Sequence, residues 1–331
     1  MKKLLPWLVL GLVIRIFLMT STLHPDIRGH NFAAYLIAQK GEIFTFYDHL
    51  RLQPRNDPLV LLYHDGLFVY PPLAYLVHAI FNKILFPLYP QKLFFTLIYD
   101  IGQTAEQPQL PWLLFLLKFP YLTADILCLV VLRKVLEPKY QFIGSLLWIF
   151  NPVTLYVSYI LAQFDIFIAL FLLLALANKR LSSLFIGLAA GFKPFPLFLL
   201  PFLPGNKIKN ISFGLCTYLV FIVPYLVSIG FRQYALLASQ TDKIVYAKIM
   251  VSGSQYLPIF FVGLVLLFWW NYNKSSQMPT WSWLMSVFLL FYSVTHFHPQ
   301  WFVWITPFLL LSLVYNNQTR LPILVIFASY I

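Results

Sequence analysis

Charged residues are scarce in this chain, and cysteine is almost absent. Only 10% of the 331 residues are charged and two are cysteine, whereas 60% are apolar. A soluble domain carries about a quarter charged residues and under half apolar ones, because polar surface must cover its interior. These shortages exclude a soluble enzyme, a disulfide-rich secreted scaffold, a disordered tail and a coiled coil. They indicate a chain that lies in lipid.

Acidic residues are the rarer sign of charge. The chain has 23 Lys and Arg against 11 Asp and Glu, which gives a net charge of +12. In membrane proteins Lys and Arg gather in cytoplasmic loops and attract anionic lipid or phosphate. We therefore expect the basic excess to reflect membrane lipid rather than nucleic acid. The two cysteines, Cys128 and Cys216, stand inside apolar runs and are expected to be small core residues.

Long apolar runs fill most of the sequence, and none alternates like an outer-membrane strand. A bilayer core of about 30 Å needs about 20 apolar residues to cross as a helix, so we predict an all-α, polytopic transmembrane bundle of about ten spans. The whole chain, residues 1–331, is expected to be one domain. The expected spans are residues 4–20, 71–90, 111–132, 140–162, 164–178, 182–203, 211–229, 252–270, 281–297 and 301–316.

The two ends of the sequence carry separate expectations. The first apolar run follows Lys2-Lys3 and lacks a small-x-small cleavage site, which favours an uncleaved signal anchor with a cytoplasmic N-terminus. The last segment, residues 320–331, is apolar but too short to cross, which suggests a clipped chain.

The basic clusters do not alternate evenly with the expected spans. Five clusters favour the cytoplasm: Lys2-Lys3, residues 133–139, residues 179–180, residues 207–209 and Lys274. Three expected spans separate the first two clusters, and one separates the third from the fourth. Either two segments are re-entrant, or residues 133–139 and 179–180 face outward. Both solutions place loop 21–70 and the turn at 296–300 on the same, non-cytoplasmic side.

Only one polar segment is long, residues 21–70. It holds five of the 11 acids and four of the seven histidines. A structureless loop of this length is unusual, so we expect it to fold on the membrane surface and to be functional. We predict a short interfacial helix over residues 31–40. The basic, aromatic stretch 230–250 is also expected to lie at the membrane interface. Three acids of the loop are expected to be solvated: Asp48, Asp57 and Asp65.

Ionisable residues inside apolar runs are expected to face an internal cavity, because lipid tolerates them poorly. Lys118 and Asp125 are seven residues apart, on one face of a helix. They either line this cavity or form a structural ion pair. Asp165, which follows Gln163-Phe164, either lines the cavity or caps a helix.

Two further positions stand at breaks in apolar runs. Lys193 precedes a Pro-x-Pro sequence, which frees backbone carbonyls within the membrane, and it either faces the cavity or snorkels to the interface. His296 and His298 stand at a helix junction, either in the cavity or as ordinary interfacial histidines. Together with the acidic loop, these residues predict a polar cavity that opens on the outer face.

Asp26 is the loop acid nearest to this cavity. It follows the first expected span by six residues, in the sequence His24-Pro25-Asp26-Ile27-Arg28. We expect a reactive carboxylate at the mouth of the cavity; the alternative is a loop residue that pairs with Arg28. His24 and His30 could bind a divalent metal with Asp26, but their spacing matches no standard site, so a metal is not favoured.

Several of these sequences, in this order, resemble the GT-C class of membrane glycosyltransferases, especially bacterial members and the mannosyltransferase that starts the GPI-anchor glycan. The resemblance covers roughly residues 20–310. Its pieces are His24-Pro25-Asp26, Tyr70-Pro71-Pro72, Lys118-x-Pro120-x4-Asp125, Asn151-Pro152 with Gln163-Phe164-Asp165, Lys193-Pro194-x-Pro196 with Pro201, and His298-Pro299-Gln300-Trp301-x2-Trp304 with Pro307.

The resemblance implies transfer of a sugar, mannose or another hexose, from a polyprenyl-phosphate donor to a glycolipid or glycan acceptor. The leaving phosphate ester is already anionic, so the chemistry needs one base and cations for the phosphate. Asp26 matches the base position, and direct displacement would invert the anomeric carbon. Lys193, His298 and Arg28 are candidates for the phosphate. Candidates for binding the rest of the substrates are Asp125, Lys118, Gln163, Asp165, Tyr70, His296, Gln300 and Trp301.

The sequence departs from this class in two respects. Asp26 has no acidic neighbour closer than Glu42, whereas several members carry paired acids near the base. The chain also lacks a large soluble C-terminal domain, which favours glycolipid or glycan acceptors over proteins. The implied place is a bacterial plasma membrane, with the site on its external face. A transporter or lipid flippase is the main alternative, although we find no internal repeat, and a scaffold subunit without chemistry is a third.

Overall fold

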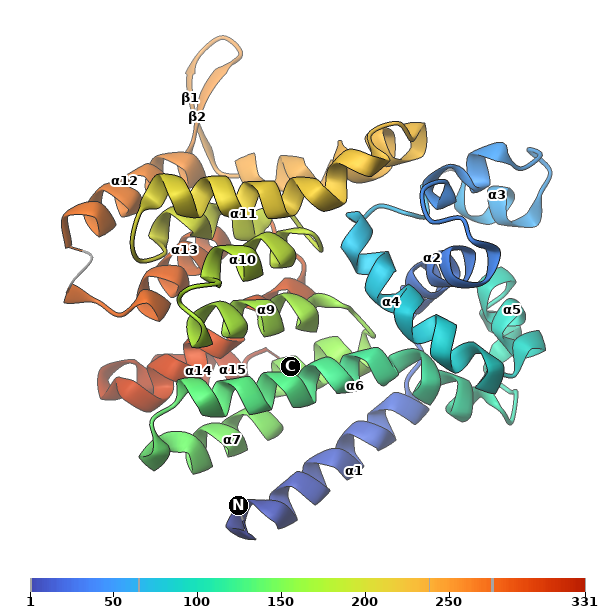
Figure 1. Ribbon diagram of the computed structural model, residues 1–331, viewed down its shortest axis with the longest axis horizontal. Helices are drawn as coiled ribbons and strands as arrows, with labels where there is room; N and C mark the ends of the chain where they lie inside the picture. Colours follow the sequence, from blue (N-terminus) through green and yellow to red (C-terminus); the bar gives the residue numbers. More distant parts are fainter. Residues whose placement is uncertain (1, 65, 238, 275–276, 331) are drawn as a thin grey trace.

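The computed structural model of the chain describes residues 2–64, 66–237, 239–274 and 277–330 and is almost entirely helical (Figure 1). This confirms the all-α prediction; Asp65 lies outside the described residues. The α-helices are α1 Leu5–Ser21, α2 Ile27–Lys40, α3 Pro58–Tyr63, α4 Pro72–Leu85, α5 Gln91–Tyr99, α6 Leu110–Val135, α7 Gln141–Ile149, α8 Pro152–Leu155, α9 Asp165–Ala177, α10 Ser182–Ala190, α11 Lys207–Ile222, α12 Ile259–Lys274, α13 Thr280–Val294, α14 Thr306–Tyr315 and α15 Arg320–Ala328.

One antiparallel hairpin interrupts this helical pattern and was not expected from the sequence. Its strands are β1 (Lys248–Ser252) and β2 (Gln255–Pro258). The hairpin projects from the body of the molecule in Figure 1, and most of its side chains are exposed. Gly253, with a φ of +53°, forms the turn between the strands, because glycine adopts this left-handed conformation without steric cost.

Three described helices are long and apolar enough to cross a bilayer: Lys2–Ser21 with 20 residues, Leu110–Val135 with 26 and Lys207–Tyr225 with 19. A fourth is added if the pair Pro138–Ile149 and Pro152–Ile160, bent by 43°, is one span. This is fewer than the ten or so spans that the composition predicts. Prolines interrupt two of the expected spans: Pro152 begins a new helix within residues 140–162, and Pro194 and Pro196 follow α10 within residues 182–203.

Residues 182–203, expected as one span, form a hairpin instead. Helix α10 is followed by the 3₁₀ helix Phe195–Phe202, which begins directly after the proline-rich break. Ser183 Oγ donates to Asn210 Oδ1 at 3.0 Å, and Asn210 Nδ2 donates to the Pro204 carbonyl at 3.0 Å. The start of α10 and the end of the hairpin therefore lie together, beside the start of α11.

Residues 71–90, expected as the second span, pack against loop 21–70. Helix α4 lies along α2, where Gln39 Nε2 donates to Asn82 Oδ1 at 3.0 Å. Lys83 Nζ donates to the Ala38 carbonyl at 3.1 Å. Helices α2 to α5 thus form one group at the right of Figure 1, beside the longer helices α1, α6 and α11.

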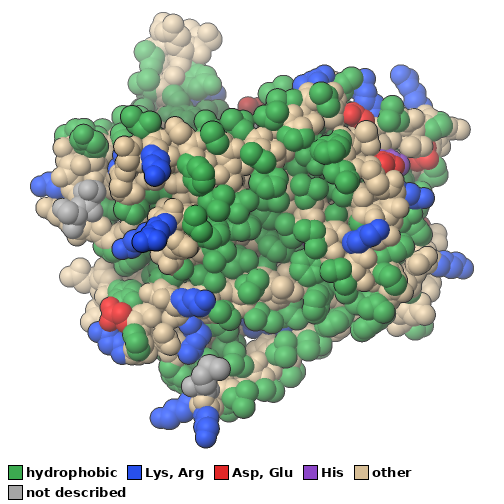
Figure 2. Space-filling model, in the orientation of Figure 1, with side chains coloured by type: hydrophobic (Ala, Val, Ile, Leu, Met, Phe, Trp, Pro, Cys, Tyr) green, Lys and Arg blue, Asp and Glu red, His purple; other side chains and the backbone are tan. Residues whose placement is uncertain are grey.

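The basic clusters lie toward one side of the molecule. In Figure 1 the start of α1, the α6–α7 and α9–α10 connections, the start of α11 and the end of α12 all lie toward the left. Figure 2 shows Lys and Arg side chains over these parts and also over the right-hand side, hydrophobic side chains across the middle, and most of the visible acidic side chains on the right.

Loop 21–70 is folded, and its acids are not all solvated. Half-buried Asp48 accepts a hydrogen bond from the Gly230 backbone N–H at 2.7 Å. A Cβ on Gly230 would lie 2.3 Å from the Tyr47 carbonyl oxygen, so only glycine fits this close approach. Asp57 caps α3 by accepting from the Leu59 N–H at 2.8 Å. Asp48 therefore ties the loop to the segment that follows α11.

We expect Gly187→Ala to destabilise the chain by about 1–3 kcal/mol, because overpacking a tight helix contact forces the backbones apart. A Cβ on Gly187 would lie 2.5 Å from the Gly214 carbonyl oxygen and 2.7 Å from Thr217 Cβ. Unfolding in detergent measures the effect. Gly263→Ala is the matched control, since its Cβ would meet only the movable end of the Leu290 side chain. Equal stability of the two variants would contradict the rigid α10–α11 contact.

Candidate functional site

Asp26 is the residue that precedes α2, and its side chain is 46% exposed. Its Oδ2 accepts a hydrogen bond from Gln163 Nε2 at 2.5 Å, and its Oδ1 lies 3.7 Å from His24 Nδ1. Gln163 is completely buried. The carboxylate is therefore held from the protein side, while its remaining lone pairs are accessible and can accept a proton.

A cavity of about 200 Å³ opens beside Asp26. Arg28 also lines it, but its guanidinium carbon lies 5.1 Å from the ring centroid of Tyr63, and it forms no ion pair with Asp26 in the described structure. The alternative in which Arg28 pairs with Asp26 is therefore wrong. The cavity is lined by Pro25, Asp26, Arg28, Gly29, His30, Tyr63, Leu67, Val69, Tyr70 and Tyr75.

Lys193 and Asp165 form a buried ion pair within a ring of aromatic side chains. Lys193 Nζ donates to Asp165 Oδ1 at 2.7 Å, and Trp304 Nε1 donates to the same oxygen at 2.7 Å. The snorkelling alternative for Lys193 is therefore wrong, and Asp165 acts as an ion-pair partner. Four ring centroids lie 5.0–5.5 Å from Lys193 Nζ, within the range of cation–π attraction: Tyr70, Phe164, Trp301 and Trp304.

A short segment connects Asp26 with Lys193. Gln163 binds Asp26, and Asp165, two residues later, binds Lys193. The segment leaves a π-helical turn through Ala162, whose φ of +53° is unfavourable for alanine. Backbone strain of this kind persists only where the surrounding structure imposes it, and it clusters at functional sites.

Three buried polar atoms in this region have no hydrogen-bond partner among the described residues: Gln163 Oε1, Asp165 Oδ2 and His30 Nδ1. The His30 ring stacks on His78, with centroids 5.5 Å apart, and meets Phe164 edge-on. Burial, followed by His78 and Lys193, lowers the pKa of His30 well below its ordinary value, so the imidazole is neutral at pH 7. Such unpaired groups can hydrogen-bond a polar ligand.

His298 lies in the same region as Lys193 and contacts a second lysine, Lys243, which was not among the residues expected from the sequence. Its Nε2 meets Lys243 Nζ, from the 3₁₀ helix Ser239–Val245. Burial lowers the pKa of His298, the nearby positive charges of Lys243 and Lys193 lower it further, and Asp26 raises it. Asp26, Lys193, His298 and Lys243 therefore lie within electrostatic range of one another. Lys193 and His298 are not among the residues that line the cavity beside Asp26, so a single cavity lined by all three stays a prediction.

The other candidates near this turn, Trp301, His296 and Gln300, have different surroundings. The Trp301 ring lies 5.5 Å from Lys193 Nζ and 5.8 Å from Lys243 Nζ. Exposed His296 packs beside Tyr246 instead of facing Lys193, with ring centroids 5.7 Å apart. Gln300 is half-buried, and the structure records no hydrogen bond from its side chain among the described residues.

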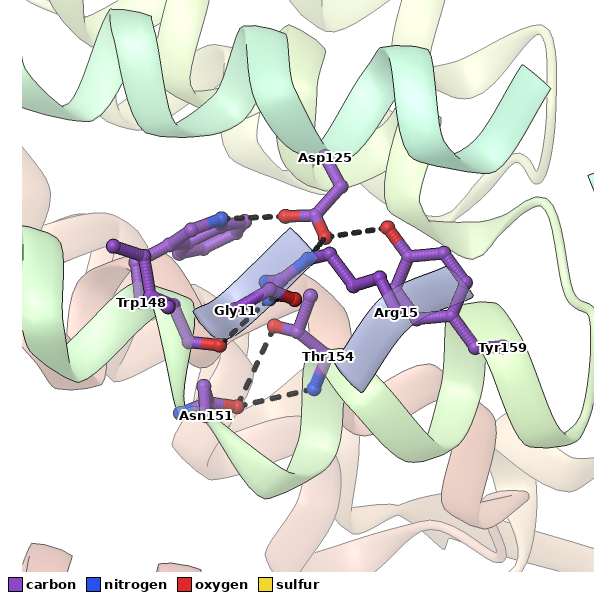
Figure 3. Close-up of polar contacts among 8 residues, drawn as sticks. Gly11, Arg15, Asp125, Trp148, Asn151, Thr154 and Tyr159 are labelled. Atoms are coloured by element: carbon purple, nitrogen blue, oxygen red, sulfur yellow. Dashed lines mark hydrogen bonds and ion pairs between the residues drawn. The ribbon is translucent and has the colours of Figure 1, made fainter. Parts of the chain in front are cut away.

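Asp125 belongs to a separate buried cluster (Figure 3). Its Oδ2 accepts from Arg15 Nε at 2.6 Å and from the Tyr159 hydroxyl at 2.6 Å, and its Oδ1 accepts from Trp148 Nε1 at 2.7 Å. Arg15 also donates to the carbonyls of Gly11 and Ile149. The cluster joins α1, α6 and the bent α7–α8 segment, and all its carboxylate bonds are to protein. The structure does not bring Asp125 into the Asp26 site.

Lys118 does not pair with Asp125, so the ion-pair alternative for these two residues is wrong. Its Nζ donates to the Thr22 carbonyl at 2.5 Å, to the Thr22 hydroxyl at 2.8 Å and to the Tyr159 carbonyl at 2.8 Å. Thr22 and Tyr159 each stand four residues before the hydrogen-bonded pair Asp26 and Gln163. Lys118 therefore holds together the two segments that carry this pair, and it does not itself line the cavity.

Metal ligands are not gathered anywhere in the part of the chain that the structure describes, because no three His, Cys, Asp or Glu side chains meet there. The fold and site define an all-helical chain with helices long enough to cross a membrane and a polar, aromatic site that contains carboxylates and cations. Comparison with protein-family models, with curated proteins and with solved structures gives no match.

Proposed function

We propose that this chain is a multi-pass membrane glycosyltransferase of the GT-C type. It transfers a hexose, mannose in the first instance, from a polyprenyl-phosphate donor to a glycolipid or glycan acceptor. The observation that carries the proposal is the arrangement around Asp26. A half-exposed carboxylate, anchored by Gln163, borders a cavity and lies within electrostatic range of Lys193 and His298.

The chemistry assigns a role to each part of the site. Asp26 takes the proton of the acceptor hydroxyl as that oxygen attacks the anomeric carbon. The bond from this carbon to the phosphate oxygen breaks, and polyprenyl phosphate leaves with the electron pair. One displacement inverts the anomeric configuration. The cations of the site stabilise the phosphate charge, and the aromatic side chains, among them Tyr70 and Trp301, offer flat faces to the sugar or prenyl chain.

The proposed setting is a bacterial plasma membrane, with the site on its external face. The five basic clusters named above lie toward one side in Figure 1, which supports this orientation because Lys and Arg favour the cytoplasmic side. With residues 182–203 re-entrant and α4 packed on α2, every basic cluster can lie in the cytoplasm. Loop 21–70 and turn 296–300 then lie on the external side, where Asp26 meets the acceptor and His298 meets the donor phosphate.

Transfer is tested with membranes that contain the full chain, radiolabelled polyprenyl-phosphate mannose and an extract of glycolipid acceptors. The expected result is label in the acceptor fraction, with an anomeric configuration opposite to that in the donor. Membranes without the chain are the control. Absence of label in the acceptor, or retention of configuration, would contradict the proposal. Movement of the labelled lipid between leaflets without transfer would indicate a flippase instead.

A further inference from the structure

Lys243 is a cation beside the site that the roles above do not use. It lies in the 3₁₀ helix Ser239–Val245, its Nζ contacts His298 Nε2, and it lies 5.8 Å from the Trp301 ring centroid. Its backbone is also held at this place. The Lys243 carbonyl accepts from the His296 N–H at 3.4 Å, and four residues later Ala247 N–H donates to the Val294 carbonyl at 3.2 Å.

The charges around Lys243 do not balance. The neighbouring cation, Lys193, is matched by Asp165 at 2.7 Å. Among the residues that the structure describes, no carboxylate forms an ion pair with Lys243, and its nearest polar partner is an imidazole, which is neutral or positive. Burial also lowers the pKa of Lys243. A half-buried ammonium beside an imidazole attracts an anion more strongly than an ammonium in open water does.

The ligand that fits this arrangement is a phosphate ester. Phosphate oxygens accept hydrogen bonds from both an ammonium and an imidazole N–H, and such charge-assisted bonds are the stronger kind. The flat Trp301 ring lies against both Lys193 and Lys243, so an apolar group attached to the phosphate would meet an aromatic face. We propose that Lys243 and His298 together bind the phosphate of a lipid phosphate ester, with Trp301 against its first isoprene or sugar unit.

This inference rests on the proposed function, since it names Lys243 as a ligand of the same donor, but its test needs no sugar transfer. The full chain in detergent is titrated with radiolabelled polyprenyl phosphate, which carries no sugar, and separately with labelled inorganic phosphate. We expect Lys243→Gln to raise the Kd for polyprenyl phosphate about tenfold to a hundredfold, because one charge-assisted hydrogen bond is lost. Lys243→Arg should keep most of the affinity.

Lys248→Gln is the matched control. Lys248 is an exposed lysine of β1, five residues away, whose ammonium lies 4.9 Å from the Tyr256 ring and outside the site. We expect its affinity for polyprenyl phosphate to equal that of the unmodified chain. Equal losses in Lys248→Gln and Lys243→Gln would overturn the proposal, because they would show unspecific attraction of the anion by net charge. An unchanged Kd in Lys243→Gln would also overturn it.

The two phosphate probes separate the possible sources of the anion. Competition by inorganic phosphate at concentrations near those of the lipid would overturn the assignment to a lipid ester, because the free ion would then fill the site equally well. Tight binding of polyprenyl phosphate alone supports it. Normal binding in Lys243→Gln together with inactive Asp26→Asn would defeat only this inference. Loss of binding in Lys243→Gln with active Asp26→Asn would defeat only the assigned base.

Discussion

Asp26→Asn is expected to lower kcat for sugar transfer roughly 10²–10⁴-fold, which is the usual contribution of a general base. The amide keeps the size of the side chain, and its oxygen can still accept the hydrogen bond from Gln163 Nε2. It has no lone pair basic enough to take the acceptor proton. Donor binding should change little, because the phosphate cations are untouched. The measurement is initial rate against donor and acceptor concentration in membranes.

Asp57→Asn is the control for this change. Asp57 also stands at a helix N-terminus, where Asn caps as well as Asp, so this variant should fold and transfer sugar normally. Both variants should insert and melt like the unmodified chain. Full activity of Asp26→Asn would show that another group takes the proton. A large loss of melting temperature in Asp26→Asn would show that the carboxylate is structural.

Asp125→Leu is expected to destabilise the chain by about 3–5 kcal/mol, because it leaves the buried Arg15 guanidinium without its counter-charge. The ion pair, at 2.6 Å, has side chains 7% and 2% exposed, so solvent cannot replace the lost partner. Trp148 Nε1 and the Tyr159 hydroxyl also lose their acceptor (Figure 3). The measurement is the free energy of unfolding in mixed detergent micelles.

The double variant Arg15→Met with Asp125→Leu separates charge from packing. Replacing both members of a buried pair by apolar residues removes the stranded charge, so the double variant should be more stable than Asp125→Leu alone. Glu137→Gln is the control for loss of an exposed acid, since its pair with Lys139 at 3.3 Å is more than half exposed, and little change is expected. A double variant as unstable as the single one would mean that the hydrogen bonds, not the ion pair, hold this cluster.

Hydrophobicity explains why the helical class was predictable and the number of spans was not. Apolar content and helix-length runs are properties of local sequence, and α1, α6 and α11 follow them closely. Residues 182–203 have the same apolar content, yet they turn back on themselves through a proline-rich break. The apolar content of a segment indicates whether it tolerates lipid. Whether the segment crosses the membrane depends on the neighbouring helices against which it packs.

The sequence predicted the residues of the candidate site better than it predicted which residues they contact. Asp26, Lys193 and His298 were chosen because ionisable groups near apolar runs usually face a cavity. The structure places them within electrostatic range of one another, but of the three only Asp26 lines the described cavity. Lys243 was missed because it lies in a polar stretch, where a lysine is unremarkable. Arg15 interrupts the first apolar run, which was the available signal, but nothing in the sequence connects it to Asp125, 110 positions away.

Local sequence by itself determined the all-helical class, the apolar surface, the folded loop 21–70 and the chemistry that each side chain can offer. Only the tertiary structure decided which partner each carboxylate binds: Asp125 takes Arg15 rather than Lys118, Asp165 takes Lys193, and Gln163 reaches Asp26 across 137 positions. The physical reason is range. Hydrophobicity and helix propensity act between near neighbours in sequence, whereas an ion pair forms wherever packing brings two charges together and excludes water.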